Sequence, residues 1–130
     1  MARFPVRSVL AVVAAAFSAP FLVAAPVKAE PQVYVYTNLY NYSFDDASLD
    51  DCISNAIQAL NENGLGNGIE FDTYGDGSVK EVTGYSKQYL HTASITCDKK
   101  TSVTYLGFAG YSSDSDATFE WYERLSDFGW

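Results

Sequence analysis

The chain has 130 residues, of which 48% are hydrophobic, 15% aromatic and 18% charged. This is enough apolar content for one globular core and too little length for two ordinary domains. Eight Lys and Arg side chains stand against sixteen Asp and Glu, so the formal charge is −8. The acidic balance argues against nucleic acid and anionic membrane surfaces as partners.

Residues 1–29 have the pattern of a secretory signal peptide. Arg3 and Arg7 precede an apolar run from Val9 to Val23, and Val27-Lys28-Ala29 fits the small-x-small pattern of a signal peptidase site. We therefore predict an exported protein, periplasmic or extracellular. The alternative is an uncleaved anchor, because the apolar run approaches the roughly 20 residues that span a bilayer.

Cleavage is expected before Glu30. A cut after Ala25 is disfavoured because Pro26 would follow the scissile bond. Cleavage removes three basic residues and no acid, so the mature chain (30–130) has five bases and sixteen acids, 5 − 16 = −11. Such a charge favours a soluble monomer with no membrane contact, and it also attracts cations or a basic partner.

Cys52 and Cys97 are the two cysteines of the chain, and we predict that they form a disulfide, because disulfides persist in exported proteins. With His91 as the single histidine, they cannot complete a four-ligand zinc site without distant acids. A C-x-x-C pair is absent, so no redox motif is present. We predict a structural bridge worth roughly 3 to 4 kcal/mol and neither a metal nor another cofactor.

The first predicted element of the mature chain is a strand from Val33 to Tyr42, because its side chains alternate with period two. One face is aliphatic, and we expect it to lie in the core. It carries Val33, Val35, Thr37 and Leu39. The other face, which carries Asn38 as well, is the candidate binding face, with Tyr34, Tyr36, Tyr40 and Tyr42.

A helix is predicted to begin after Ser48, a good N-cap, with Asp50 and Asp51 in its first turn. Asn63-Gly64 supplies the stop signal. The spacing of three and four residues places one apolar stripe on the core, which includes the first cysteine. The stripe consists of Leu49, Cys52, Ile53, Ala56, Ile57 and Leu60.

Three β-like stretches and a second amphipathic helix follow. The stretches are Ile69–Tyr74, with an extension through Val79 to Tyr85, then Tyr89–Cys97 and Ser102–Tyr111. Asp76-Gly77 is a hairpin signal, and the final helix lies within Asp114–Trp130. The sequence therefore predicts an α+β fold of two layers, mainly an antiparallel sheet with two helices on one face, in the order β-α-β-β-β-α.

A set of short motifs resembles an uncharacterised family of small exported bacterial proteins, classed as a domain of unknown function. The motifs are Cys52 followed by Ala56, a strand ending Ile95-Thr96-Cys97, and a strand ending Ala109-Gly110 before the last helix. The resemblance covers most of the mature chain and implies a disulfide-linked α+β fold. It implies no activity and no functional residues.

Candidate catalytic groups are sparse. His91 would have to serve any Ser-His-Asp or Cys-His arrangement, yet no nucleophile motif accompanies it, and we expect a partly buried or surface strand histidine. Paired carboxylates for acid–base work are Asp45–Asp46, Asp50–Asp51 and Asp114-x-Asp116. All three groups lie at predicted helix starts, so we expect them to cap the helices.

The segment Asp72–Gly77 is similar to a calcium loop in having acids at its first and fifth positions and Gly at its sixth. Tyr74 occupies the third position and Thr83 the twelfth, where a Glu is needed, so a hairpin turn is predicted. A surface calcium site built from some of these acids is the alternative.

The leading functional hypothesis is a non-enzymatic binding module that contacts a protein or a carbohydrate through the tyrosine face. Tyrosine combines a flat apolar body with a polar tip, which suits such contacts and equally suits packing beneath a second layer. One alternative is a small secreted hydrolase or lyase using paired acids near His91. Another is a secreted enzyme inhibitor that presents the loop Gly75–Ser78.

Overall fold

The computed structural model describes residues 30–42 and 48–130. The predicted signal peptide, residues 1–29, and the pair Asp45–Asp46 lie outside the described residues. The elements, in chain order, are β1 (Gln32–Asn41), α1 (Leu49–Glu62), β2 (Asn67–Tyr74), β3 (Val79–Tyr85), β4 (His91–Asp98), β5 (Val103–Ser112) and α2 (Ser115–Ser126). The predicted α+β class is confirmed, and the first of the three β-like stretches is resolved into a hairpin, β2 and β3.

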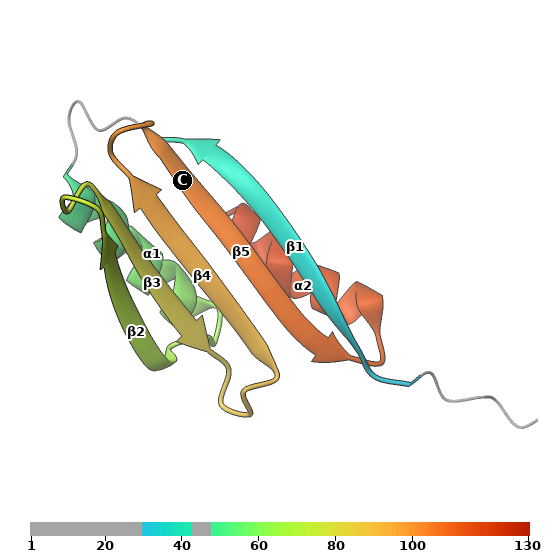
Figure 1. Ribbon diagram of the computed structural model, residues 1–130. Helices are drawn as coiled ribbons and strands as arrows, with labels where there is room; N and C mark the ends of the chain where they lie inside the picture. The colour runs from blue at the N-terminus through green and yellow to red at the C-terminus, as the bar shows by residue number, and fades with distance from the viewer. Residues whose placement is uncertain (1–29, 43–47) are drawn as a thin grey trace, which may run out of the picture.

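The five strands form one antiparallel sheet in the order β1-β5-β4-β3-β2, with β1 and β2 at its edges. Consecutive strands from β2 to β5 are joined by short turns, whereas β1 pairs with the last strand of the chain. Both helices cover the same face of the sheet, α1 behind β3 and β4 and α2 behind β5 and β1 (Figure 1). The described residues thus form two layers, and neither of their two helices lies on the opposite face of the sheet.

Helix α1 begins as predicted. The Ser48 side chain accepts a hydrogen bond from the backbone N–H of Asp51, and the Asp51 carboxylate accepts one from the backbone N–H of Ser48. This reciprocal capping box satisfies two N–H groups that the first turn leaves without helical partners. The bond from Ser48 also lowers the pKa of Asp51.

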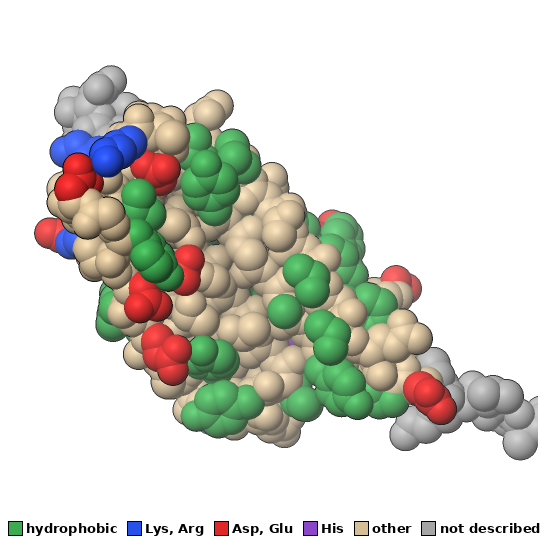
Figure 2. Space-filling model, viewed as in Figure 1, with side chains coloured by type: hydrophobic (Ala, Val, Ile, Leu, Met, Phe, Trp, Pro, Cys, Tyr) green, Lys and Arg blue, Asp and Glu red, His purple; other side chains and the backbone are tan. Residues whose placement is uncertain are grey.

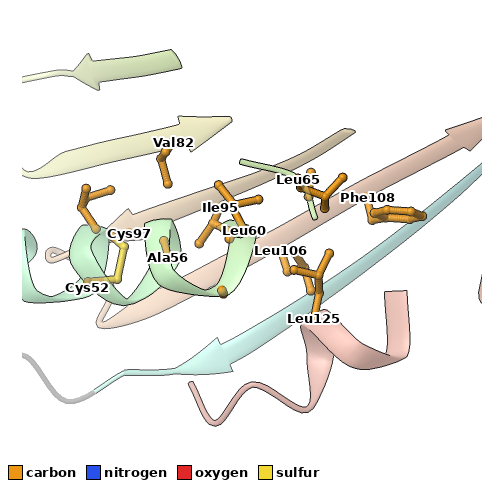
Figure 3. Packing of buried hydrophobic residues seen from close by; sticks show 13 residues of the cluster. Cys52, Ala56, Leu60, Leu65, Val82, Ile95, Cys97, Leu106, Phe108 and Leu125 are labelled. Carbon is orange, nitrogen blue, oxygen red and sulfur yellow. A yellow bond between two sulfur atoms is a disulfide. The ribbon is translucent and has the colours of Figure 1, made fainter. Parts of the chain in front are cut away.

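The core lies between α1, α2 and the covered face of the sheet (Figure 3). Cys52 on α1 and Cys97 on β4 form the predicted disulfide, with both residues fully buried and their Cα atoms 6.3 Å apart. The bridge therefore joins the helix layer to the sheet layer. Leu60, Leu65, Ile95, Leu106, Phe108 and Leu125 are the largest apolar side chains of this core.

The prediction for the two faces of β1 was wrong. Val33, Val35 and Leu39 are 65%, 66% and 51% exposed, while Tyr36 and Tyr40 pack against the core. Both faces of this strand are apolar, and α2 covers the aromatic one because rings bury more area and stack on the rings of the helix. Among the described residues, no helix has the length and apolar character to cross a bilayer.

Candidate functional site

The side of the sheet that neither α1 nor α2 covers, called the open face below, is the candidate site. Side chains alternate along each strand, so the pairing register decides which residues share this face. Its members are Val33, Val35, Thr37 and Leu39 of β1; Val103, Tyr105, Gly107, Ala109 and Tyr111 of β5; Thr92, Ser94, Thr96 and Asp98 of β4; Val79, Glu81, Thr83 and Tyr85 of β3; and Glu70, Asp72 and Tyr74 of β2.

The centre of the open face is hollowed around Gly107. This residue has no side chain, and the side chains opposite it, Thr37 on β1 and Ser94 on β4, are short. One hollow of about 280 Å³ is lined by Thr37, Asn38, Glu81, Ser94, Thr96, Tyr105, Leu106 and Gly107. A second, of about 220 Å³, is lined by Val35, Thr92, Ser94, Gly107, Phe108 and Ala109. Gly107 and Ser94 belong to both, so the hollows are continuous along β4 and β5.

Apolar side chains border the hollows on the side of β1 and β5. Tyr105 is 40% exposed and Tyr111 is 47% exposed, although both belong to a strand paired on both edges. The helices therefore cover only one face of β5. Figure 2 shows hydrophobic side chains in separate patches around a centre of other side chains and backbone.

Carboxylates lie on the β2 and β3 side of the open face, and Glu81 of β3 lines one of the hollows. Thr96 Oγ1 donates to Glu81 Oε2 at 2.6 Å, and Tyr85 Oη donates to Glu70 Oε2 at 3.0 Å. The bond to Glu70 raises the pKa of Tyr85, and the charge of Glu81 raises the pKa of Tyr74. Both phenols therefore stay neutral at ordinary pH.

Hydroxyl side chains of β3 and β4 lie in and beside the hollows, together with apolar side chains and the backbone of Gly107. Thr83 Oγ1 donates to Ser94 Oγ at 3.2 Å, and Thr92 Oγ1 donates to the Gly84 carbonyl at 3.1 Å. A hydroxyl has one donor and two acceptor lone pairs, so each of these groups keeps hydrogen-bonding capacity for a bound molecule. The open face thus combines flat apolar rings, hydroxyls and carboxylates within one shallow surface.

The candidate binding face predicted from the sequence is not bare. Tyr34, Tyr36, Tyr40 and Tyr42 are all half-buried, on the side of the sheet that α2 covers. Tyr36 stacks on Tyr122 of α2 with ring centroids 5.2 Å apart, and Tyr40 contacts Trp130 at 6.0 Å. Tyr36 therefore packs beneath α2 and Tyr40 beneath the C-terminal residue, as expected if this face lies beneath a second layer.

His91 lies on the covered side, at the start of β4. Its ring is stacked between Trp121, at 4.9 Å, and Phe108, at 6.0 Å. Burial lowers the pKa of His91. In the described part of the chain, no hydrogen bond or ion pair joins this ring to a carboxylate. The structure therefore shows no such bond between His91 and the two described acid pairs, Asp50–Asp51 and Asp114-x-Asp116.

The described acid pairs serve the helix starts, as predicted. Asp51 completes the capping box of α1, and its neighbour Asp50 forms an ion pair with Lys80. Asp114 is the N-cap of α2, and its side chain accepts from the backbone N–H groups of Asp116 and Ala117. Each carboxylate that caps a helix is also favoured there by the helix dipole.

The segment similar to a calcium loop forms the end of β2 and the turn of the β2–β3 hairpin, and the predicted hairpin turn is confirmed. The backbone N–H of Ser78 bonds to Asp76, whose carboxylate pairs with Lys100 at 3.2 Å. These bonds lower the pKa of Asp76 to about 2. Within residues 30–42 and 48–130, no group of three His, Cys, Asp or Glu side chains is placed to hold a metal ion.

The sequence interpretation missed the open face as a site. The alternating hydroxyls Thr92, Ser94 and Thr96 and the lone Gly107 were available signals. They carry information only when β4 and β5 are known to lie side by side in this register, which places Ser94 opposite Gly107.

Comparison with known proteins leaves the family open. No family model matches the chain, and no curated protein matches it in sequence. The resemblance to a family of small exported bacterial proteins stays a prediction.

Proposed function

We propose that this protein is an exported, non-enzymatic binding module that holds a neutral carbohydrate chain on its open face. The observation that carries the proposal is the hollow around Gly107, which Ser94 and Thr96 line together with the exposed Tyr105. Binding sites of this kind combine apolar area with a few polar groups that fix orientation.

The chemistry of a sugar ring fits this surface. Its flat C–H face packs on an aromatic ring, and its hydroxyl edge exchanges hydrogen bonds with hydroxyls and carboxylates. Tyr105 offers the ring, Ser94 and Thr96 offer hydroxyls, and Glu81 lines the same hollow with a carboxylate. A shallow open surface suits a chain of several sugars.

The charge of the open face favours a neutral ligand. Glu70, Asp72, Glu81 and Asp98 belong to it, and its members listed above include no Lys or Arg. An anionic polymer would be repelled by these carboxylates and by the net charge of the mature chain.

Export is supported by two features. Residues 1–29 have the signal pattern described above, and Cys52 and Cys97 form a buried disulfide. Such bridges persist in oxidising compartments and are rare in the cytosol.

The test is binding of the protein recovered from an exporting host to neutral oligosaccharides, namely cello-, xylo- and chito-oligosaccharides, by calorimetry. We expect one class to bind and Tyr105→Ala to weaken binding at least tenfold. Phe119→Ala is the matched control, because Phe119 of α2 is also 40% exposed but lies on the covered side. We expect this control to bind as the wild type does.

Two results would overturn the proposal. One is the absence of binding to any of these sugars at millimolar concentration. The other is equal loss of binding in the Tyr105 and Phe119 variants, which would place the site elsewhere. Hydrolysis of a bound sugar, detected as shorter products, would show that the protein is an enzyme and would support the hydrolase hypothesis instead.

A further inference from the structure

The two edges of the sheet differ in how they are protected. Natural edge strands are blunted by charges, bulges or prolines, because their free N–H and C=O groups otherwise pair with another strand. Edge strand β2 has such features, with Glu70 and Asp72 on it and a shift in register between Asn67 and Glu70. Edge strand β1 has no charged residue, and its register with β5 runs unshifted from Gln32 to Asn41.

The hydrogen-bond pattern shows which groups of β1 point outward. The N–H of Tyr42 bonds to the carbonyl of Ser102, so Tyr42 and Ser102 are a hydrogen-bonded pair that continues the β1–β5 ladder. In an antiparallel ladder the bonded residues alternate, so even-numbered residues of β1 bond to β5. Odd-numbered residues, among them Val33 and Val35, therefore direct both backbone groups away from the sheet.

One part of this outer edge is already occupied. The Tyr122 hydroxyl donates to the carbonyl of Thr37 at 3.2 Å, and the Asn38 side chain accepts from the N–H of Leu39 at 2.8 Å. Among the described residues, nothing pairs with the outward groups of Val33 and Val35. The open part of the edge therefore extends from Val33 to the N–H of Thr37.

We propose that this open edge pairs with the same edge of a second copy of the chain, antiparallel, about a two-fold axis at Tyr34. In that register Val33 faces Val35 of the second copy, and Val35 faces Val33 of the second copy. Each pair exchanges two N–H···O bonds, so all four outward groups of the valines in each copy are satisfied.

The neighbouring positions fit the same register. Thr37 would face Pro31 of the second copy, which has an acceptor carbonyl but no N–H. The N–H of Thr37 is unoccupied and can bond to that carbonyl. Its own carbonyl needs no donor from proline, because Tyr122 already supplies one. In this register each outward N–H of the edge meets a carbonyl of the second copy, and the one carbonyl that would face proline is already bonded to Tyr122.

Side chains and charge favour a second copy over an unrelated strand. Val33 and Val35 lie on the open face and Tyr34 on the covered side, so an added strand must be apolar on both faces, as β1 itself is. The net charge predicts a monomer, because like copies repel. The described stretch from Pro31 to Tyr42 contains no charged residue, so repulsion is least where β1 meets β1.

The proposal does not depend on carbohydrate binding, and its first test is sedimentation of the exported protein over a range of concentrations. We expect a concentration-dependent dimer. Val33→Pro removes an outward N–H without touching the β1–β5 ladder, a place where edge strands accept proline, and should weaken self-association at least tenfold. Leu39→Pro is the matched control, because its N–H also points outward but lies beyond the pairing segment; it should dimerise normally.

Val35→Lys keeps the test decisive if a proline variant fails to fold. This side chain is 66% exposed, so lysine disturbs no core contact but brings two charges together at the proposed axis. Phe71→Lys, at a residue of β2 that is 60% exposed, is its control at the opposite edge. A monomer at millimolar concentration, or a dimer unaffected by Val35→Lys, would overturn the proposal.

The register has its own test. The two copies of Tyr34 would form a pair without hydrogen bonds, with Cα atoms about 4.5 Å apart, within reach of a disulfide. Tyr34→Cys should therefore yield an intermolecular disulfide on oxidation. Gln32→Cys should not, because the two copies of residue 32 would be offset by about 13 Å along the strands. Cross-linking of the Gln32 variant alone would overturn this register.

Discussion

The ring of His91 on β4 is stacked on the indole of Trp121 on α2, with centroids 4.9 Å apart and planes 6° from parallel. Phe108 of β5 lies on the ring as well, at 6.0 Å. This stack fixes α2 to the sheet at the end of the molecule away from the disulfide. It makes the single histidine part of the contact between α2 and the sheet.

The protein should become less stable as the pH falls, because His91 becomes protonated. Burial lowers the pKa of His91 in the folded state, while the unfolded chain titrates near 6.5. Protonation therefore favours unfolding, and stability is lost as the pH falls below about 6.5 and levels off below the folded pKa. Urea unfolding at pH 7.5 and pH 5 measures this loss. His91→Phe keeps a ring in the stack but does not titrate, so it should lose less stability over this pH range; an equal loss would contradict the assignment.

Trp121→Ala should destabilise the fold by about 2 to 3 kcal/mol, since a large, partly buried ring is removed. Trp121 contacts His91 on one side, and the guanidinium of Arg124 lies 5.1 Å from its ring. The check is the free energy of unfolding in urea at pH 7.5. Phe119→Ala, at a 40% exposed ring of the same helix, should cost about 1 kcal/mol or less.

Replacing both Cys52 and Cys97 by Ala should lower the free energy of unfolding by about 4 kcal/mol. The bridge closes a loop with a sequence separation of 45, and a loop of this length restricts the unfolded chain by that amount in the entropic account. Chemical unfolding of the wild type and the double variant, both without reductant, measures the difference. A difference below about 1 kcal/mol would show that the disulfide contributes little to the stability of the fold.

Two glycines of the sheet should respond oppositely to alanine. A Cβ at Gly84 would collide with the backbone carbonyl oxygen of Leu65, so Gly84→Ala should cost about 2 kcal/mol or more. At Gly107 the nearest atom is the Ser94 carbonyl oxygen at 3.8 Å, an ordinary contact, so Gly107→Ala should be neutral or stabilise by up to about 1 kcal/mol. Thermal unfolding of the two variants measures both effects. An equal loss of stability in the two variants would contradict the packing around these glycines.

Several features were predictable because they depend on near neighbours in the chain. Ser48 and Asp51 form the cap of α1, and Asp114 caps α2, because a helix start needs acceptors for its free N–H groups. The pairing of Cys52 with Cys97 followed from the number of cysteines and the export signal. The α+β class followed from the two periodicities of the apolar residues.

The position of the candidate site on the open face depends on the tertiary structure. Strand β1 is apolar on both faces, so its alternation predicted a strand but could not tell which face α2 would cover. The rings of Tyr36 and Tyr122 stack across the two layers, so α2 covers the tyrosine face of β1. Val33 and Val35, on the other face, are therefore exposed. Contacts between residues this far apart in the chain leave no local pattern. The sequence by itself determined the elements, their caps and the disulfide, and only packing between the layers determined which surface remained free to bind.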